Sequence, residues 1–249
     1  MRSWQIWTLM GVSDIRQRYK RSRFGQFWIT LSMAVFVGGI GIVFSALFNQ
    51  SVAEYVPYLA VNYIIWTFMS GVVSDSTTAF VQGTVFLRQE NLPKSIFAMR
   101  VIVRNLIALA HNLIILPPVF LIFGVVPSWA ILLAIPGLAM MLVAAFLVTL
   151  LCGILCTRFR DLPQIIANLL QLAFFLTPIM WRIDQLGDSG WWVLHLNPFA
   201  IFLRIVADPI RGYVPETLDY VSAAVVIGIL LAITWPLFAR FRARIVYWL

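Results

Sequence analysis

Residues 157–181, TRFRDLPQIIANLLQLAFFLTPIMW, join a short charged turn to an apolar segment. The turn carries Arg158, Arg160 and Asp161, and the apolar segment contains two amide side chains before it reaches a Thr-Pro pair. About 20 apolar residues are enough to cross a bilayer as a helix, but an inert anchor needs neither a charged turn nor buried amides. The stretch therefore predicts a membrane-spanning helix with a recognition element at one end.

The whole chain shares this apolar character. Of its 249 residues, 61% are hydrophobic and only 11% are charged, whereas soluble domains are roughly one quarter charged. We predict an all-α, polytopic membrane protein with about six transmembrane helices, folded as a single domain over residues 1–249. The predicted spans are 25–48, 57–81, 101–123, 130–156, 162–181 and 220–239.

Basic residues gather on one side of these spans. The N-terminal segment holds six, the second loop four, the fourth loop two and the C-terminal tail three, which together are fifteen of the eighteen Lys and Arg residues. Short cytoplasmic loops collect Lys and Arg, so we expect both termini to face the cytoplasm. A nucleic-acid site instead gathers its cations on one soluble surface, so the net charge of +8 does not indicate a nucleic-acid partner.

An amphipathic helix is predicted over residues 1–24. Trp4, Trp7, Ile15 and Tyr19, with a glycine between the second and third of them, recur every three or four residues and fall on one helical stripe. Such a helix lies in the membrane interface, with its apolar side toward lipid and its cations toward anionic headgroups. A simple anchor and a helix that moves with a partner fit the pattern equally well.

The second cytoplasmic loop, residues 82–100, mixes charged and apolar side chains more than a plain linker does. A proline stands where a short helix would break or start. We predict a short helix that lies against a cytoplasmic partner, although a segment on the membrane surface would look similar. The residues assigned to this contact are Arg88, Gln89, Glu90, Pro93 and Phe97.

The external stretch between the fifth and sixth spans, residues 182–219, contains a second apolar run. Residues 196–203 are too few to cross a bilayer, and Pro198 and Pro209 supply breaks. Irregular backbone at membrane depth is tolerated where protein or a wet cavity covers it. We therefore predict short re-entrant helices in this region.

Two ionisable side chains fall inside the predicted spans. Asp75 fits either a polar inner vestibule or interhelical hydrogen bonding, whereas His111 fits a packing role better than proton transfer because no acidic partner is evident. Cys152 and Cys156 lie far in sequence from any histidine, so no metal site is predicted. No phosphate-cradling loop is present either, so any ATP must bind to another chain.

Taken in order along the chain, these residues resemble the permease subunits of ABC-2-type exporters for polysaccharides, the group that serves O-antigens, capsules and teichoic acids. The resemblance is carried by Arg18-Tyr19 with Ser22, Gly25 and Trp28, by Phe159-Arg160-Asp161 with Phe174-Phe175-Leu176-Thr177-Pro178-Ile179, and by Asn197-Pro198.

The resemblance implies a bacterial inner-membrane complex in which two copies of this chain join two copies of a separate ATP-binding subunit. ATP and Mg would then sit on that partner, and this chain would carry no cofactor and no catalytic residue. The loop at 88–97 would be the coupling element, with Arg158, Arg160 and Asp161 as a second contact. The substrate would be a glycan or polyol-phosphate polymer, commonly linked to a polyprenyl-diphosphate lipid.

A wall for such a substrate is predicted in the fifth span. Sugar rings pack their C–H faces on aromatic planes, and their hydroxyls need hydrogen-bonding partners when they leave bulk water. By helical spacing, Asn168, Gln171 and Phe175 share one face, which we expect to point into a channel between two copies. Phe174 and Trp181 are the other candidates, although aromatic residues at a span's end also occur at the membrane interface.

Two other classes of function remain open. An ion- or proton-coupled transporter would carry internal repeats and an intramembrane charge pair, and neither is evident in the sequence. A membrane enzyme acting on lipid-linked glycans would need catalytic carboxylates or a metal motif in a loop. For that class the external Asp184, Asp188 and Asp208 are the available acids.

Overall fold

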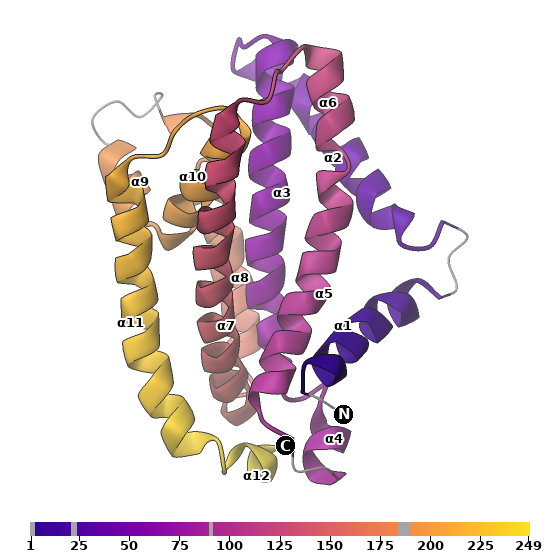
Figure 1. The fold of residues 1–249 in the computed structure, drawn as a ribbon, viewed down its shortest axis with the longest axis vertical. Coiled ribbons are helices and arrows are strands. Elements are labelled where there is room, and N and C mark those ends of the chain that lie inside the picture. The colour runs from indigo at the N-terminus through magenta and orange to yellow at the C-terminus, as the bar shows by residue number, and fades with distance from the viewer. Residues whose placement is uncertain (1–2, 21–23, 90–91, 184–189) are drawn as a thin grey trace.

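Long helices packed side by side make up the body of the protein (Figure 1). The computed structural model describes residues 3–20, 24–89, 92–183 and 190–249, and the regular elements in this part of the chain are all helical, which confirms the all-α prediction. In chain order they are α1 (Ser3–Tyr19), α2 (Phe27–Leu47), α3 (Val52–Ser76), α4 (Thr84–Gln89), α5 (Ser95–Leu113), α6 (Leu116–Phe123), the 3-10 helix η1 (Trp129–Leu133), α7 (Ala134–Arg158), α8 (Leu162–Leu176), α9 (Gly190–Leu196), α10 (Pro198–Ile210), α11 (Thr217–Phe241) and α12 (Ile245–Trp248).

Five of the predicted spans are long and apolar enough to cross a membrane: α2, α3, α5 with α6, η1 with α7, and α11. The fifth predicted span is shorter than expected. Its helix, α8, has 15 residues, about 22 Å at 1.5 Å per residue, against a hydrocarbon core of about 30 Å. The helix ends because Thr177 takes an extended conformation (φ −95°, ψ 138°) ahead of Pro178, and proline disfavours a helical conformation in the residue before it.

Helix α3 lies at the centre of the bundle, in contact with α2, α5, α6, α7, α8 and α10. It begins five residues earlier than the predicted span, because the Ser51 hydroxyl accepts from the Glu54 backbone N–H and caps the helix at Val52. Pro57 therefore lies inside the helix rather than at its start, and it is buried.

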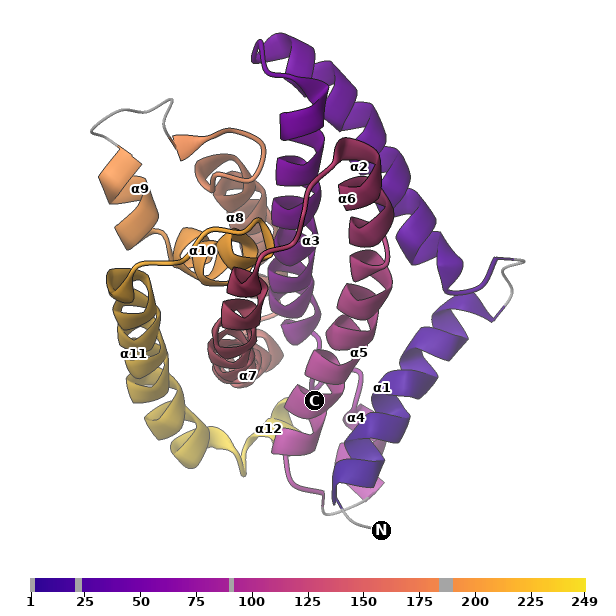
Figure 2. The ribbon, with the colours of Figure 1, turned by 45° about the horizontal axis from the view of Figure 1, so that its top comes forward.

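Helices α9 and α10 form the segment between α8 and α11, as Figure 2 shows. Most of α10 is buried among α3, α7 and α11. The approach of α7 depends on Gly137, because a Cβ there would stand 2.2 Å from the Ile205 carbonyl oxygen. The two short helices are thus present, while their re-entry into the membrane stays a prediction.

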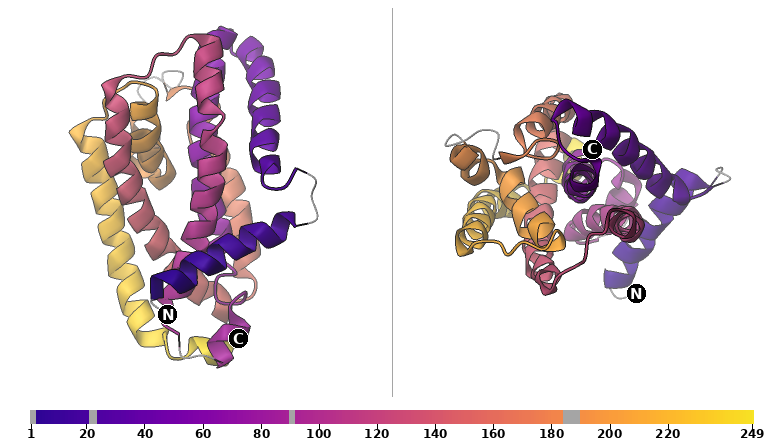
Figure 3. Two further views of the ribbon diagram at one scale, coloured as in Figure 1. Left: turned by 45° about the vertical axis from the view of Figure 1, so that its right-hand side comes forward. Right: turned by 90° about the horizontal axis from the view of Figure 1, so that it is seen from above.

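The two ends of the bundle differ. The start of α1, α4 and α12 lie together at one end, whereas α9 and α10 lie toward the other (Figures 1 and 3). Helix α1 crosses the bundle obliquely against α5 (Figure 3, left). The two basic loops and the C-terminal tail therefore share one end of the molecule.

Candidate functional site

Helix α8 presents a polar stripe on its outer surface. Asn168 and Gln171 are exposed, and the Phe175 ring is 65% exposed. Gln164 extends the same stripe, because its Nε2 donates to the Asn168 Oδ1 over 3.4 Å, one helical turn away. The predicted common face of Asn168, Gln171 and Phe175 is therefore open in the single chain. Gln164 was not among the predicted residues, although its spacing of four from Asn168 gave the signal.

The other two channel candidates do not share this stripe. Phe174 is half-buried and packs against Tyr63 and Trp66 of α3, with ring centroids 6.2 and 5.7 Å apart. Trp181 is also half-buried, and its indole Nε1 donates to the Phe175 carbonyl oxygen over 3.0 Å. Phe174 anchors α8 to α3, and Trp181 closes the end of α8.

An open row of amides restricts what can lie against α8. Leaving one amide without a hydrogen-bond partner in an apolar medium costs about 2–7 kcal/mol. Gln164, Asn168 and Gln171 are exposed on a helix of otherwise apolar composition. This stripe therefore fits water, another polypeptide or a hydroxyl-rich molecule far better than it fits lipid tails.

The end of α8 is tied to the start of α10. Asn197 caps α10, because its Oδ1 accepts from the backbone N–H groups of Phe199 and Ala200 over 3.0 and 3.4 Å. Its Nδ2 donates to the Thr177 hydroxyl over 2.9 Å. The Thr-Pro and Asn-Pro pairs, 20 residues apart in sequence, thus form one joint.

At the other end of the bundle, the predicted coupling loop has an exposed rim and a buried support. Arg88, Gln89 and Pro93 are exposed, and Glu90 lies outside the described residues. Phe97 is 0% exposed and its ring lies against Phe80 (centroids 6.4 Å apart) and over Gly83. The prediction that Phe97 contacts a partner directly is therefore wrong. Helix α5 starts at Ser95, and its direction places this ring in the core.

The charged turn between α7 and α8 lies beside the C-terminal helix α12. Arg158, Arg160 and Asp161 are exposed. Arg160 donates to the Trp248 carbonyl oxygen over 3.2 Å, and the Arg158 guanidinium lies 5.9 Å from the Trp248 ring centroid. Exposed cations held in fixed positions suit an acidic protein surface.

Helix α12 also reaches the coupling loop. Ile245 is 0% exposed and packs in one cluster with Leu87 of α4, Phe97 of α5 and Ile154 of α7. The C-terminal residues thus join the two segments that sequence reasoning assigned to partner contact. From the sequence, only the basic residues of the C-terminal tail were interpreted. The apolar run IVYWL at 245–249 was the signal for this packing, and it was missed.

Helix α1 does not rest wholly on lipid. Of the predicted stripe, Trp4 is 52% exposed and Trp7 is half-buried, but Ile15 is 2% exposed because it packs inside the bundle. A Cβ on Gly11 would stand 2.7 Å from a Val103 methyl of α5, so the glycine permits the close crossing. Tyr19 ends the helix. The expectation of a purely lipid-facing stripe is wrong for its middle part.

An ionic network fixes α1 to the bundle. Asp14 accepts from the Arg100 Nε and terminal nitrogen over 2.7 and 2.6 Å and lies 3.5 Å from Arg104. Arg104 also pairs with Asp75 over 2.9 Å, and Asn105 donates to the same carboxylate. The charges alternate in the order Arg100, Asp14, Arg104 and Asp75. Each of the two carboxylates is therefore paired with at least one guanidinium.

This network corrects one prediction and confirms another. Arg104 was placed with the loop, but it is 6% exposed within α5 and forms the charge pair that the sequence did not reveal. Interhelical hydrogen bonding is confirmed for Asp75, which also borders a pocket of about 230 Å³. His111 is held within its own helix, since its Nδ1 lies 2.8 Å from the Ile107 carbonyl oxygen, and its packing role stays a prediction.

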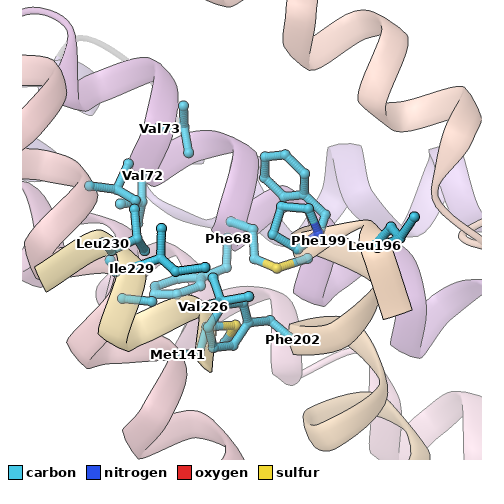
Figure 4. A pocket seen from close by; sticks show the side chains of 15 residues that line it. Phe68, Val72, Val73, Met141, Leu196, Phe199, Phe202, Val226, Ile229 and Leu230 are labelled. Carbon is cyan, nitrogen blue, oxygen red and sulfur yellow. The ribbon is translucent and has the colours of Figure 1, made fainter. Parts of the chain in front are cut away.

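A larger pocket of about 470 Å³ lies between α3, α7, α10 and α11 (Figure 4). All fifteen residues that line it are apolar, among them Phe68, Met141, Phe202 and Leu230. A glycan's hydroxyls would find no partner there. This pocket is therefore unsuited to a polar solute.

Comparison with known proteins agrees with the polytopic architecture. The family model described as "ABC-2 type transporter" matches residues 5–209. Two relatives from Klebsiella pneumoniae, each named "O-antigen export system permease protein RfbA", are 20% and 21% identical, and each alignment covers 88% of this chain and 85% of the relative. A Myxococcus xanthus protein of the same name is 25% identical over 75% of this chain and 73% of its own length.

Proposed function

The chain belongs to the ABC-2 type transporter membrane family, and on that premise we propose that it is the membrane subunit of an ATP-driven polysaccharide exporter. The family and the relatives support a role as a transport permease, and the apolar helices support a location in a bacterial membrane. The proposed cargo is a glycan such as an O-antigen or capsule, linked to a polyprenyl diphosphate. The names of the three relatives support this cargo class.

The observation that carries the proposal is the amide stripe on α8. Gln164, Asn168 and Gln171 with Phe175 offer hydrogen bonds and one aromatic plane on a single open face. Sugars need both kinds of contact. A membrane-facing stripe of this kind would be costly, so we propose that it lines a channel formed with a second copy of the chain.

A second copy has room to approach at α2. Cβ atoms on Gly38 and Gly39 would meet nothing within 4 Å, whereas one on Gly41 would press on Val56 of α3 at 2.8 Å. Small residues let helices approach closely. We propose that the open pair serves the contact between copies while Gly41 serves packing within the chain.

ATP hydrolysis belongs to a separate subunit in this proposal, with ATP and Mg bound there. The docking surface would be α4 with Arg88 and Gln89, the turn of Arg158, Arg160 and Asp161, and α12 between them. The elements that carry these cations, α4 and the turn beside α12, lie at one end of the bundle (Figure 1). The excess of Lys and Arg at this end supports a cytoplasmic position for it in the inner membrane.

Paired substitution of the two predicted amides tests the channel. Asn168→Leu with Gln171→Leu removes the hydrogen-bonding groups but keeps similar volume. We expect surface glycan to fall about tenfold or more, as for the loss of one to three kcal/mol of polar contact, while assembly with the ATP-binding subunit persists. Gln26→Leu, which removes an amide just before α2, is the matched control.

Normal export in the paired variant would reject the channel assignment. Export that continued after the ATP-binding subunit was inactivated would instead favour the ion-coupled alternative, for which the Arg104–Asp75 pair is now a candidate element.

A further inference from the structure

A second polar pocket, of about 330 Å³, lies between α3, α9, α10 and the segment after α8. Its size falls at the lower end of the range for small-molecule sites, about 300–1,000 Å³. The side chains that give it its chemistry are Tyr58, Asn62, Arg182, Arg204, Asp208 and Arg211. Unlike the apolar pocket, it is thus lined by several charged groups.

Among the described residues, guanidinium groups outnumber carboxylate groups at this pocket. Arg204 is paired with Asp219 over 2.9 Å and with Asp208 over 3.6 Å. Arg211 is paired with Asp208. Within residues 3–20, 24–89, 92–183 and 190–249, no ion pair is formed by Arg182. Two of the three cations therefore share two carboxylates, and Arg182 forms no ion pair in this part of the structure.

Two of these cations lie over one aromatic ring. The guanidinium carbons of Arg211 and Arg182 stand 4.7 and 5.4 Å from the Tyr58 ring centroid. The ring attracts both, but the two like charges repel each other. An anion that reached both guanidinium groups would lower that repulsion, and guanidinium groups are well matched to phosphate and carboxylate oxygens.

Unused hydrogen-bonding capacity points to the same conclusion. The Arg211 Nε is buried and has no acceptor among the described residues. Asn62 is 1% exposed, and its Oδ1 is buried without a donor in the same part of the chain, although its Nδ2 donates to the Pro178 carbonyl oxygen over 3.4 Å. Buried polar atoms are seldom left unpaired, so the pocket lacks both an acceptor for Arg211 and a donor for Asn62.

We propose that this pocket binds a phosphate oxyanion carried on a hydroxyl-bearing group. Arg182 and Arg211 hold the oxyanion, and the Asn62 Oδ1 accepts from a neighbouring hydroxyl. Sugar phosphates and the headgroup of phosphatidylglycerol both have this chemistry. The site deepens the proposed export function, since it lies away from α4 and α12, at the end of the bundle where a translocated glycan would leave.

The binding test uses the purified full chain in nanodiscs of phosphatidylcholine and isothermal titration with glucose 1-phosphate, glucose and inorganic phosphate. We expect glucose 1-phosphate to bind, and glucose to bind about tenfold or more weakly, as for the loss of a charge-assisted contact. Arg182→Gln with Arg211→Gln should weaken glucose 1-phosphate by a similar factor. Arg242→Gln, an exposed cation at the opposite end, should leave it unchanged.

Asn62→Leu supplies a second variant that keeps the cations. It should retain binding of inorganic phosphate and lose the preference for glucose 1-phosphate over inorganic phosphate. Equal binding of glucose and glucose 1-phosphate, or unchanged glucose 1-phosphate binding in the folded double arginine variant, would overturn the proposal. A folded elution profile from size-exclusion chromatography is required of each variant.

A parallel arm separates the two sources of phosphate. If glucose 1-phosphate binds the wild type less tightly in nanodiscs that contain phosphatidylglycerol than in nanodiscs of phosphatidylcholine alone, the occupant is a lipid headgroup. If the two affinities are equal, the occupant is a glycan phosphate. The assay uses neither ATP nor a partner subunit. Loss of binding would therefore reject this site alone, and loss of ATP-dependent export with intact binding would reject only the exporter proposal.

Discussion

The Asn197 side-chain amide donates to the Thr177 hydroxyl over 2.9 Å, while its carbonyl oxygen caps α10. One residue thus fixes both the end of α8 and the start of α10. Because the Tyr55 and Tyr58 hydroxyls also donate to carbonyl oxygens of the segment after α8, at Met180, Pro178 and Trp181, this joint is anchored to α3. The Thr177 end of the amide stripe is thus held by side-chain hydrogen bonds to backbone carbonyls as well as by packing.

Asn197→Ala should lower the free energy of unfolding by about 1–3 kcal/mol, because it removes the helix cap and the bond to Thr177. Asn197→Asp keeps the capping oxygen but loses the Nδ2 donor, so it should cost less than Asn197→Ala. Thermal unfolding in detergent measures both. An equal effect of the two substitutions would show that the capping oxygen contributes nothing.

Asp14→Asn should release α1 from the bundle. The change leaves Arg100 and Arg104, both largely buried, without full charge compensation, which costs about 1–3 kcal/mol. Hydrogen exchange in residues 3–20 should rise, while exchange in α7 stays slow. Glu54→Gln, an exposed acid at the start of α3, is the control. Unchanged protection of α1 would contradict a locking role for the pair.

Ile245→Ala should loosen the contact between α12, α4 and α7. The side chain is fully buried, and Ile-to-Ala changes in a core cost about 2–5 kcal/mol. We expect weaker co-purification of an ATP-binding subunit, since α4 loses its support. Ile233→Ala makes the same change at an α11 side chain that is 47% exposed and should leave stability unaltered. Equal retention of the partner by both variants would argue against α12 as a support.

Gly83→Ala should displace the ring of Phe97, because the new Cβ would stand 2.3 Å from a ring carbon. Overpacking of this kind costs about 1–3 kcal/mol. Gly228→Ala in α11 meets nothing within 4 Å and should be neutral or stabilising by up to about 1 kcal/mol. Thermal unfolding of both variants compares them directly, and equal midpoints would exclude the close contact.

The sequence by itself determined that this protein lies in a membrane and in what order its helices follow one another. Apolar runs of spanning length and the one-sided Lys and Arg depend only on local composition, because a helix satisfies its own backbone hydrogen bonds in lipid. The common face of Asn168, Gln171 and Phe175 was predictable for the same reason, since helical spacing is local. The length of α8 was predicted wrongly, although the Thr-Pro pair that ends the helix is a local signal.

Only the tertiary structure decided which distant residues meet. Asp14 pairs with Arg100, and Ile245 packs in one cluster with Leu87. Arg182 and Arg211 both lie over the Tyr58 ring. All of these contacts join segments that are far apart in the sequence. Periodicity gives the direction of a side chain from its own helix but not the neighbour that it meets. The charged turn at 158–161 was visible from the start, whereas its companion α12 became a feature of that surface only when the chain had folded back upon it.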